Sequence, residues 1–125
     1  MLILGGAFNG KLNYIKEKYG LDNNDIYYCN SDKLELDKKV ISGFHIFVRE
    51  MLLNNKDIIK YVEENKCILK EKIIISDDIN SGIIPIEKVD RIWRDTNGKV
   101  LQILSSENKK VIRIFFGLEM VLKNE

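Results

Sequence analysis

The sequence predicts an α/β fold, a mostly parallel β-sheet flanked by helices. Short apolar segments alternate along the chain with segments whose apolar residues recur at helical spacing. One of the short segments, Ile73–Ile75, is apolar without interruption, as strands are when both faces of a parallel sheet are covered. A glycine-rich segment, 5–10, directly follows the first apolar run. Such alternation predicts parallel strands joined by right-handed crossovers.

The first half of the chain is predicted to begin with a strand, a helix and a second strand. Leu2–Leu4 is the first strand, and the glycine-rich turn leads into a helix over Lys11–Tyr19 that ends at Gly20. Asp25–Cys29 is the second strand. The segment from Leu36 to about Asn54 is predicted to be helical. Its apolar residues at helical spacing are Val40, Phe44, Phe47, Val48, Met51 and Leu52.

The second half continues the alternation. Ile58–Glu64 is predicted to be helical and Lys72–Ser76 to be a buried strand. Pro85 suits the first turn of a long helix. Val111–Phe116 is predicted to be another buried strand, and Glu119–Lys123 a short edge strand after a turn. The inward face predicted for the long helix comprises Val89, Ile92, Trp93, Val100, Ile103 and Leu104.

Composition excludes several classes of function. A length of 125 residues predicts a single domain, 1–125, and the chain contains one proline and no glycine- or serine-rich linker. The formal net charge is only +1, and lysines are interleaved with acidic residues, which argues against binding to nucleic acid. No apolar run is long enough to span a membrane, and the start has no secretory signal pattern. Two distant cysteines, Cys29 and Cys67, form no metal-binding pattern, so we expect reduced thiols in a cytoplasmic protein.

The strongest functional signal lies in residues 5–12, which follow a strand and open a helix. They match G-x-x-x-x-G-K, the phosphate-binding loop (P-loop), except that Leu12 stands where the loop needs Ser or Thr. Backbone N–H groups of such a loop surround a phosphate, and Lys11 supplies a positive charge. The missing hydroxyl normally ligates Mg²⁺, so we expect weakened Mg²⁺ binding. The alternative is a tight turn whose lysine faces solvent. The residues expected to bind the phosphates of GTP or ATP are Gly5, Gly6, Ala7, Phe8, Asn9, Gly10, Lys11 and Leu12.

Two further groups are candidates for chemistry. Asp77 and Asp78 follow the buried strand, and carboxylates at the carboxyl end of a parallel strand face the ligand crevice. There they can hold Mg²⁺ or accept a proton, although Asp is also common in turns. His45 is the only histidine and is flanked by Phe44 and Ile46. It is either a covalent nucleophile, a proton carrier or a core residue of an amphipathic helix, and the spacing names no partner for it.

Four segments resemble a known family, in the same order along the chain. Residues 75–85 resemble V-T-N-E-V-G-x-G-I-V-P of the bifunctional adenosylcobinamide kinase / adenosylcobinamide-phosphate guanylyltransferase family. Residues 94–102 resemble its R-D-x-x-G-R-x-N-Q segment, and residues 111–123 its E-V-x-L-V-V-x-G-x-P-x-x-L-K ending. The opening, 3–11, resembles its I-L-V-T-G-G-A-R-S-G-K-S.

The resemblance implies a RecA-like P-loop NTPase fold acting in the late stage of cobalamin assembly. Members phosphorylate adenosylcobinamide, transfer GMP from GTP through a histidine intermediate, and are typically homo-oligomers. It implies cobinamide as a substrate, Lys11 and the 5–10 backbone as phosphate ligands, and Asp78 as the metal-associated or general-base carboxylate. Asp77 is the second candidate metal ligand, and His45 the candidate nucleotidyl acceptor.

The chain departs from the family pattern at several of these positions. Leu12 replaces the serine after the loop lysine, and Asp77-Asp78 replaces Asn-Glu. The family places its histidine in a basic segment after the second strand, followed by a strand that ends in an acidic residue and Cys. Only 30–53 can cover both parts here, so His45 matches that histidine with one inserted residue or lies near the acidic strand end. The alternatives are a non-catalytic nucleotide-sensing or subunit-interaction paralogue and, third, a different small nucleotide-dependent kinase.

Overall fold

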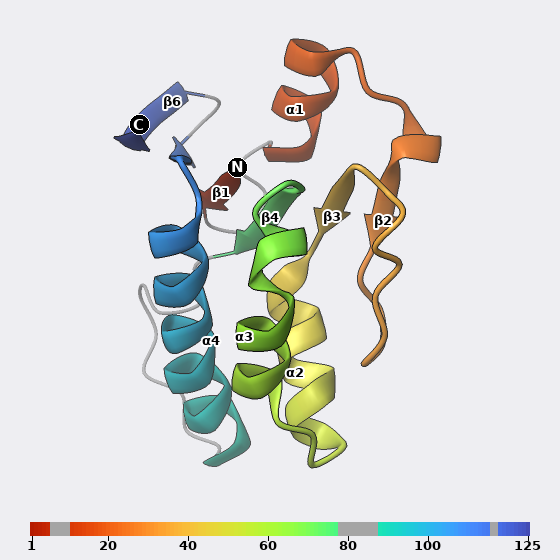
Figure 1. The fold of residues 1–125 in the computed structure, drawn as a ribbon, viewed down its shortest axis with the longest axis vertical. Coiled ribbons are helices and arrows are strands. Elements are labelled where there is room, and N and C mark those ends of the chain that lie inside the picture. Colours follow the sequence, from red (N-terminus) through yellow and green to blue (C-terminus); the bar gives the residue numbers. More distant parts are fainter. Residues whose placement is uncertain (6–10, 78–87, 116–117) are drawn as a thin grey trace.

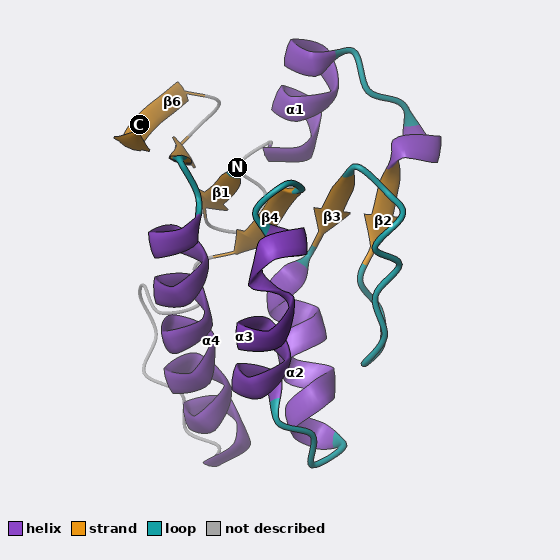
Figure 2. Cartoon of the chain, viewed as in Figure 1, coloured by secondary structure: helices purple, strands orange, loops and turns teal. Residues whose placement is uncertain are grey.

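The computed structural model describes residues 1–5, 11–77, 88–115 and 118–125, and these form a six-stranded sheet with helices on both faces. The strand order is β2-β3-β4-β1-β5-β6, in which five strands are parallel and the edge strand β6 pairs antiparallel with β5 (Figures 1 and 2). This confirms the predicted α/β class with a mostly parallel sheet, and the architecture is consistent with a P-loop NTPase fold. The strands are β1 (Leu2–Gly5), β2 (Ile26–Tyr28), β3 (Val40–Ser42), β4 (Ile73–Asp77), β5 (Lys110–Phe115) and β6 (Leu118–Asn124).

Alternating side chains of the strands build two separate apolar cores. On one face, Leu2, Ile41 and Ile74 pack with three helices, which lie side by side in Figure 1. On the other face, their strand neighbours Ile3 and Val40 pack with Ile15, Ile26 and Ile75. The first face is covered by α2 (Phe44–Leu53), α3 (Ile58–Leu69) and α4 (Lys88–Glu107), and the second by α1 (Lys11–Tyr19). Burial of both faces explains why the central strands are continuously apolar.

Helix ends follow local sequence signals. The predicted helix α1 is confirmed with its predicted bounds, and Gly20 after it adopts φ +63°, a left-handed conformation that favours glycine. The side chain of Asp57 caps α3 by accepting a hydrogen bond from the backbone N–H of Lys60 at 3.1 Å. This helix continues beyond the predicted end at Glu64 to Leu69.

The prediction of one helix from Leu36 to about Asn54 is wrong in its first part. Strand β3 occupies Val40–Ser42, and only the segment from Phe44 onward is helical. Gly43 separates the two elements with φ +81°. Val40 lies four residues before Phe44, so its spacing also fits a helix, but it faces the second core as part of the sheet.

The inward face predicted for the last helix is also partly wrong. Val89 and Ile92 are each 43% exposed, whereas Val100 and Leu104 are buried as expected. Trp93 and Ile103 are partly buried against the first core, and Asn97 and Leu101, which were not part of the predicted inward face, are buried as well. Pro85 lies outside the described residues.

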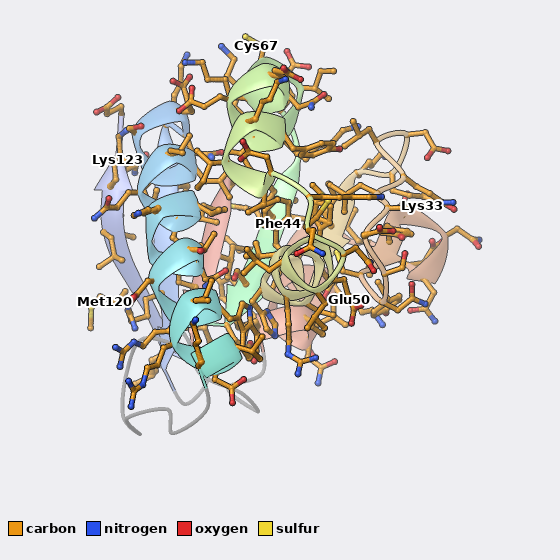
Figure 3. The ribbon with its side chains drawn as sticks, turned by 90° about the horizontal axis from the view of Figure 1, so that it is seen from below. Lys33, Phe44, Glu50, Cys67, Met120 and Lys123 are labelled. Atoms are coloured by element: carbon orange, nitrogen blue, oxygen red, sulfur yellow. The ribbon has the colours of Figure 1, made fainter. Side chains whose placement is uncertain are left out.

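The carboxyl-terminal strand is an exposed edge, as predicted. Leu118, Met120, Val121 and Leu122 are all exposed, and Figure 3 shows Met120 on the outside of the molecule, in contrast to Phe44 in its interior. Within the described residues, no helix combines the length and the apolar content that crossing a membrane requires.

Candidate nucleotide-binding site

The carboxyl ends of β1 and β4 bring Lys11 and Asp77 together. Gly5 and Asp77 are register partners at the ends of these adjacent parallel strands. Lys11 opens α1 shortly after β1, and its Nζ lies 2.6 Å from Oδ1 of Asp77. Lys11 is only 8% exposed and the Asp77 side chain 23%, so the ion pair is partly shielded from solvent at the edge where α/β sheets bind ligands.

Gly5 lies where a side chain would not fit. A Cβ placed on Gly5 would be 2.7 Å from the carbonyl oxygen of Ile114 in the neighbouring strand and 3.3 Å from Cδ of Lys11. The first of these contacts is with backbone, which cannot rotate away. The glycine therefore permits β1 and β5 to pair up to the point where the loop begins, and it leaves room for the Lys11 side chain.

His45 is the third member of this cluster. The residue lies in the first turn of α2, directly after β3, and its Nδ1 accepts a hydrogen bond from the backbone N–H of Asp77 at 3.1 Å. Its Nε2 lies 3.5 Å from Oδ2 of the same residue. The imidazole thus contacts both the backbone and the carboxylate of Asp77, and the sequence alone named no partner for it.

The environment keeps the His45 imidazole neutral. Burial lowers its pKa below the ordinary value of 6.5, the Asp77 carboxylate acts in the opposite direction, and the positive charge of Lys11 lowers it further. Because Nδ1 accepts a hydrogen bond, the single proton of the neutral ring resides on Nε2, which faces Asp77.

Trp93 links α4 to the cluster. Its indole N–H donates to the carbonyl oxygen of His45 at 2.8 Å, and its ring stacks on the imidazole with centroids 6.3 Å apart. The guanidinium of Arg49 lies over the indole, 5.6 Å from its centroid. Sequence reasoning assigned Trp93 to the core only. The sequence did offer one signal for a further role. A partly buried tryptophan usually needs a hydrogen-bond acceptor for its indole N–H.

The predicted site residues fall into three groups. The structure brings together Lys11, His45 and Asp77, with Gly5 beside them. Leu12 is partly buried and packs against the second core through α1, so its side chain has an apolar role. Gly6, Ala7, Phe8, Asn9, Gly10 and Asp78 lie outside the described residues.

The described residues do not fit a Mg²⁺ site. Mg²⁺ in nucleotide sites is held by one or two carboxylates, phosphate oxygens and often a loop hydroxyl. Leu12 has no oxygen in its side chain, and both carboxylate oxygens of Asp77 already face cationic or N–H groups. In the described part of the chain, no three His, Cys, Asp or Glu side chains are grouped to hold a metal ion.

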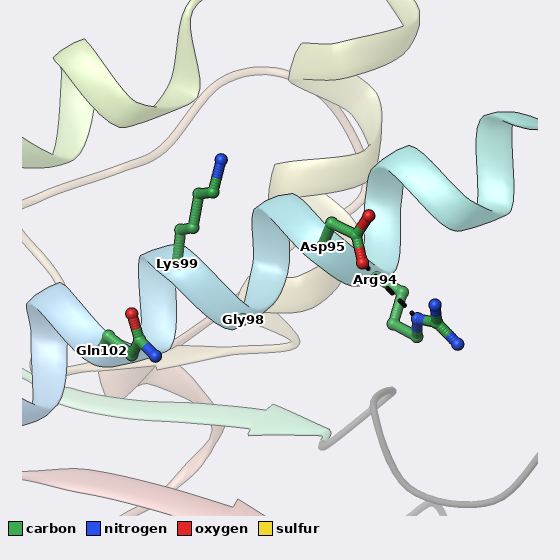
Figure 4. A pocket seen from close by; sticks show the side chains of 5 residues that line it. All are labelled: Arg94, Asp95, Gly98, Lys99 and Gln102. Atoms are coloured by element: carbon green, nitrogen blue, oxygen red, sulfur yellow. Dashed lines mark ion pairs between the residues drawn. The ribbon is translucent and has the colours of Figure 1, made fainter.

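The Arg-Asp-x-x-Gly motif lies elsewhere, on the exposed side of α4. It lines an open groove of about 410 Å³, and Arg94 Nε lies 3.6 Å from Oδ1 of the adjacent Asp95. Figure 4 shows Arg94 and Lys99 extending from the helix in different directions. These side chains do not converge on a single point. The groove is lined by Arg94, Asp95, Gly98, Lys99 and Gln102.

A family model decides the relationship of this chain to known proteins. The model described as cobinamide kinase / cobinamide phosphate guanyltransferase matches residues 38–122, more than half of the chain. The protein belongs to this family. A comparison with curated proteins found no match. The resemblance seen in the sequence is therefore confirmed for this part of the chain.

The matched region of this cobinamide kinase / cobinamide phosphate guanyltransferase family member contains His45, Asp77 and Trp93 but not the loop 5–12. Family members carry their histidine between the second strand and the next one. In this chain the corresponding connection, 29–39, contains no histidine, and His45 lies beyond β3 in α2.

Proposed function

We propose that this family member binds the phosphates of GTP or ATP at the carboxyl edge of β1 and β4 and acts on cobinamide as a kinase or guanylyltransferase. The observation that carries this proposal is the partly buried ion pair of Lys11 with Asp77, 2.6 Å apart. Lys11 occupies the lysine position of a phosphate-binding loop, and the Asp77 carboxylate holds its ammonium group at the strand edge, where a phosphate would be a second anionic partner. Backbone N–H groups of residues 5–12 would complete the phosphate site.

Within this proposal, Asp77 and Asp78 are the candidate carboxylates, because they stand in sequence at the carboxyl end of β4. A carboxylate there can accept the proton of an attacking hydroxyl. We assign no step to Mg²⁺, because the described donor groups do not fit it.

A second candidate function is a non-catalytic nucleotide-binding or subunit-interaction paralogue. The packing of Leu12 against the second core favours it, because the position that supplies a metal-ligating hydroxyl in active phosphate loops is an apolar packing position here. Transfer of labelled γ-phosphate or GMP to cobinamide distinguishes the two functions. Nucleotide binding without transfer to cobinamide would support the paralogue.

A homo-oligomer is part of the proposal. The edge strand β6 exposes Leu118, Met120, Val121 and Leu122, and an apolar strand edge is a surface that a second copy of the chain can cover. Size-exclusion chromatography with light scattering tests this. A monomer at every concentration would contradict the proposed oligomer. The proposed nucleotide site is tested separately.

Isothermal titration of the purified chain with GTP and with ATP, each with Mg²⁺ or with a chelator, tests the nucleotide site. We expect one nucleotide per chain, with inorganic phosphate competing weakly. Since Leu12 supplies no hydroxyl to ligate Mg²⁺, we expect binding to persist in the chelator. Absence of binding of both nucleotides under both conditions would overturn the proposed function.

A further inference from the structure

The geometry points to His45 as a positioning residue that holds Asp77 in the orientation in which its carboxylate meets Lys11. The role is non-covalent and depends on two contacts made by one imidazole ring. This inference deepens the proposed function and rests on it only for the effect on nucleotide binding. The contacts themselves are properties of the protein without nucleotide.

The first contact continues the sheet where a strand has ended. Ile75 pairs with Ser42, the last residue of β3, and its carbonyl oxygen accepts the N–H of Gly43 at 2.9 Å. Residues two apart in a strand direct their backbone groups to the same neighbour, so the N–H of Asp77 also points to the β3 side. There Nδ1 of His45 accepts it at 3.1 Å. The imidazole thereby satisfies a donor that no further residue of β3 reaches.

The second contact orients the carboxylate. With Nδ1 acting as an acceptor, the proton of the neutral ring is on Nε2, 3.5 Å from Oδ2 of Asp77. The other oxygen, Oδ1, lies 2.6 Å from Nζ of Lys11. Each oxygen of the carboxylate therefore has its own partner, and rotation of the carboxylate away from Lys11 would break both contacts.

Contacts with Trp93 restrain the imidazole ring of His45. The His45 side chain is 13% exposed, and Trp93 stacks on it while donating its indole N–H to the His45 carbonyl oxygen. Glycine at position 43 allows α2 to begin at once after β3, which delivers His45 to the end of β4. A side chain clamped in this way retains little rotamer freedom, as a positioning residue requires.

The same geometry argues against a covalent role. A histidine that attacks phosphorus needs an unprotonated nitrogen directed at the nucleotide. The Nδ1 lone pair of His45 points to the N–H of Asp77, and Nε2 carries the proton. Attack by either nitrogen would first have to break a contact with Asp77.

The first experiment uses the nucleotide-free protein. Nitrogen-15 NMR of the imidazole reports which nitrogen carries the proton, and amide hydrogen exchange reports the protection of the Asp77 N–H. We expect the Nε2–H form in the wild type. His45→Phe, which removes both contacts, should accelerate exchange at Asp77 about tenfold or more, as expected for loss of a part-buried hydrogen bond. The amide of Ile74, inside the sheet, should change little.

Two further variants separate positioning from a general structural effect. His45→Asn retains an acceptor for the Asp77 N–H but has no group that reaches Oδ2, so it should restore most of the protection. Ile46→Phe places the same new ring at an exposed neighbouring position and should leave exchange at Asp77 unchanged. An Nδ1–H tautomer in the wild type, or unchanged Asp77 exchange in folded His45→Phe, would overturn the inference. The tautomer measurement stands even if His45→Phe fails to fold.

The second experiment measures GTP affinity by titration. His45→Phe should weaken GTP binding about tenfold. In the Lys11→Ala background, the same substitution should change GTP affinity little, because both residues act through the carboxylate of Asp77. Independent, additive effects would contradict positioning through Asp77. If the wild type binds neither GTP nor ATP, the proposed function fails, and the exchange experiment still decides the role of His45.

Discussion

Lys11 and Asp77 meet across the carboxyl edge of β1 and β4, with Nζ of the lysine 2.6 Å from Oδ1 of the aspartate. The pair joins the first residue of α1 to the last residue of β4. An ammonium group already held at a strand edge and shielded from water is well placed for a phosphate, because its charge acts in a region of low dielectric.

Lys11→Ala should weaken nucleotide binding by about 1.5–3 kcal/mol, the range for a charge-assisted contact. Isothermal titration with GTP and ATP measures the change. Lys16→Ala is the matched control, because Lys16 lies on the same helix but its Nζ donates a hydrogen bond to Oδ1 of Asn23. This variant should bind nucleotide as the wild type does. Equal affinities of the wild type and Lys11→Ala would rule out the phosphate-loop interpretation. Thermal unfolding of both variants shows whether the fold is retained.

Gly5→Ala should lower the free energy of unfolding by about 1–3 kcal/mol, the usual cost of forcing an extra carbon into a packed site. The new Cβ would lie 2.7 Å from the carbonyl oxygen of Ile114, so β1 and β5 would have to separate locally. Urea unfolding measures the loss. Gly20→Asn is the control, since nothing lies within 4 Å of a Cβ there and Asn tolerates its left-handed φ of +63°. Comparable stability of Gly5→Ala and the wild type would refute the predicted steric conflict.

Elements with strong local signals could be predicted from the sequence. Short apolar runs identified β1, β4 and β5, although Arg113 interrupts the last of them, and the glycine after Tyr19 marked the end of α1. Strand β3 was missed because Val40 continues the helical spacing of Phe44 and Val48. A short strand of this type owes its conformation to pairing with β2 and β4, which no local pattern reveals.

The sequence was enough to identify most residues of the candidate site but not the contacts between them. Lys11 was recognised by the G-x-x-x-x-G-K pattern after a strand, and Asp77 by its place at the end of a strand in a predicted parallel sheet. Their contact depends on β1 and β4 being neighbours, which follows from the path of the chain through the sheet. The contacts of His45 with Asp77 and Trp93 join three elements, so nothing in the sequence around His45 indicated them.

The cysteines should differ sharply in reactivity. Burial raises the pKa of Cys29 to about 12, so almost no thiolate forms near neutral pH, whereas Cys67 is exposed at the periphery of the molecule (Figure 3). Iodoacetamide at pH 8 should therefore modify Cys67 first, and mass spectrometry of peptides identifies the site. Cys67→Ser should remove the fast phase of labelling. Alkylation of Cys29 at the rate of Cys67 in the native protein would contradict the buried position of Cys29.

Stability should fall as pH decreases below about 6.5. The folded state lowers the pKa of His45, so the unfolded chain binds a proton at a higher pH than the native protein does. The stabilisation is complete above the ordinary value of 6.5 and is lost as the pH falls from there through the lowered pKa. Urea unfolding over this range measures the effect, and His45→Asn should have a flatter profile. Identical profiles for the two proteins would show that His45 has the same pKa in both states.

Radiolabelled GTP should leave no stable covalent GMP on the chain. A guanylylated histidine needs a nitrogen lone pair aimed at the α-phosphorus, and His45 directs its Nδ1 to the backbone N–H of Asp77 while Nε2 carries the proton beside Oδ2. Incubation with α-labelled GTP, denaturation and gel separation measures retained label. His45→Asn, verified as folded, is the control for label attached elsewhere. Acid-labile label that is retained by the wild type and absent from His45→Asn would contradict this prediction. It would mean that the imidazole leaves Asp77 when nucleotide binds, and that the chain uses the family's two-step guanylyl transfer with its histidine supplied from α2.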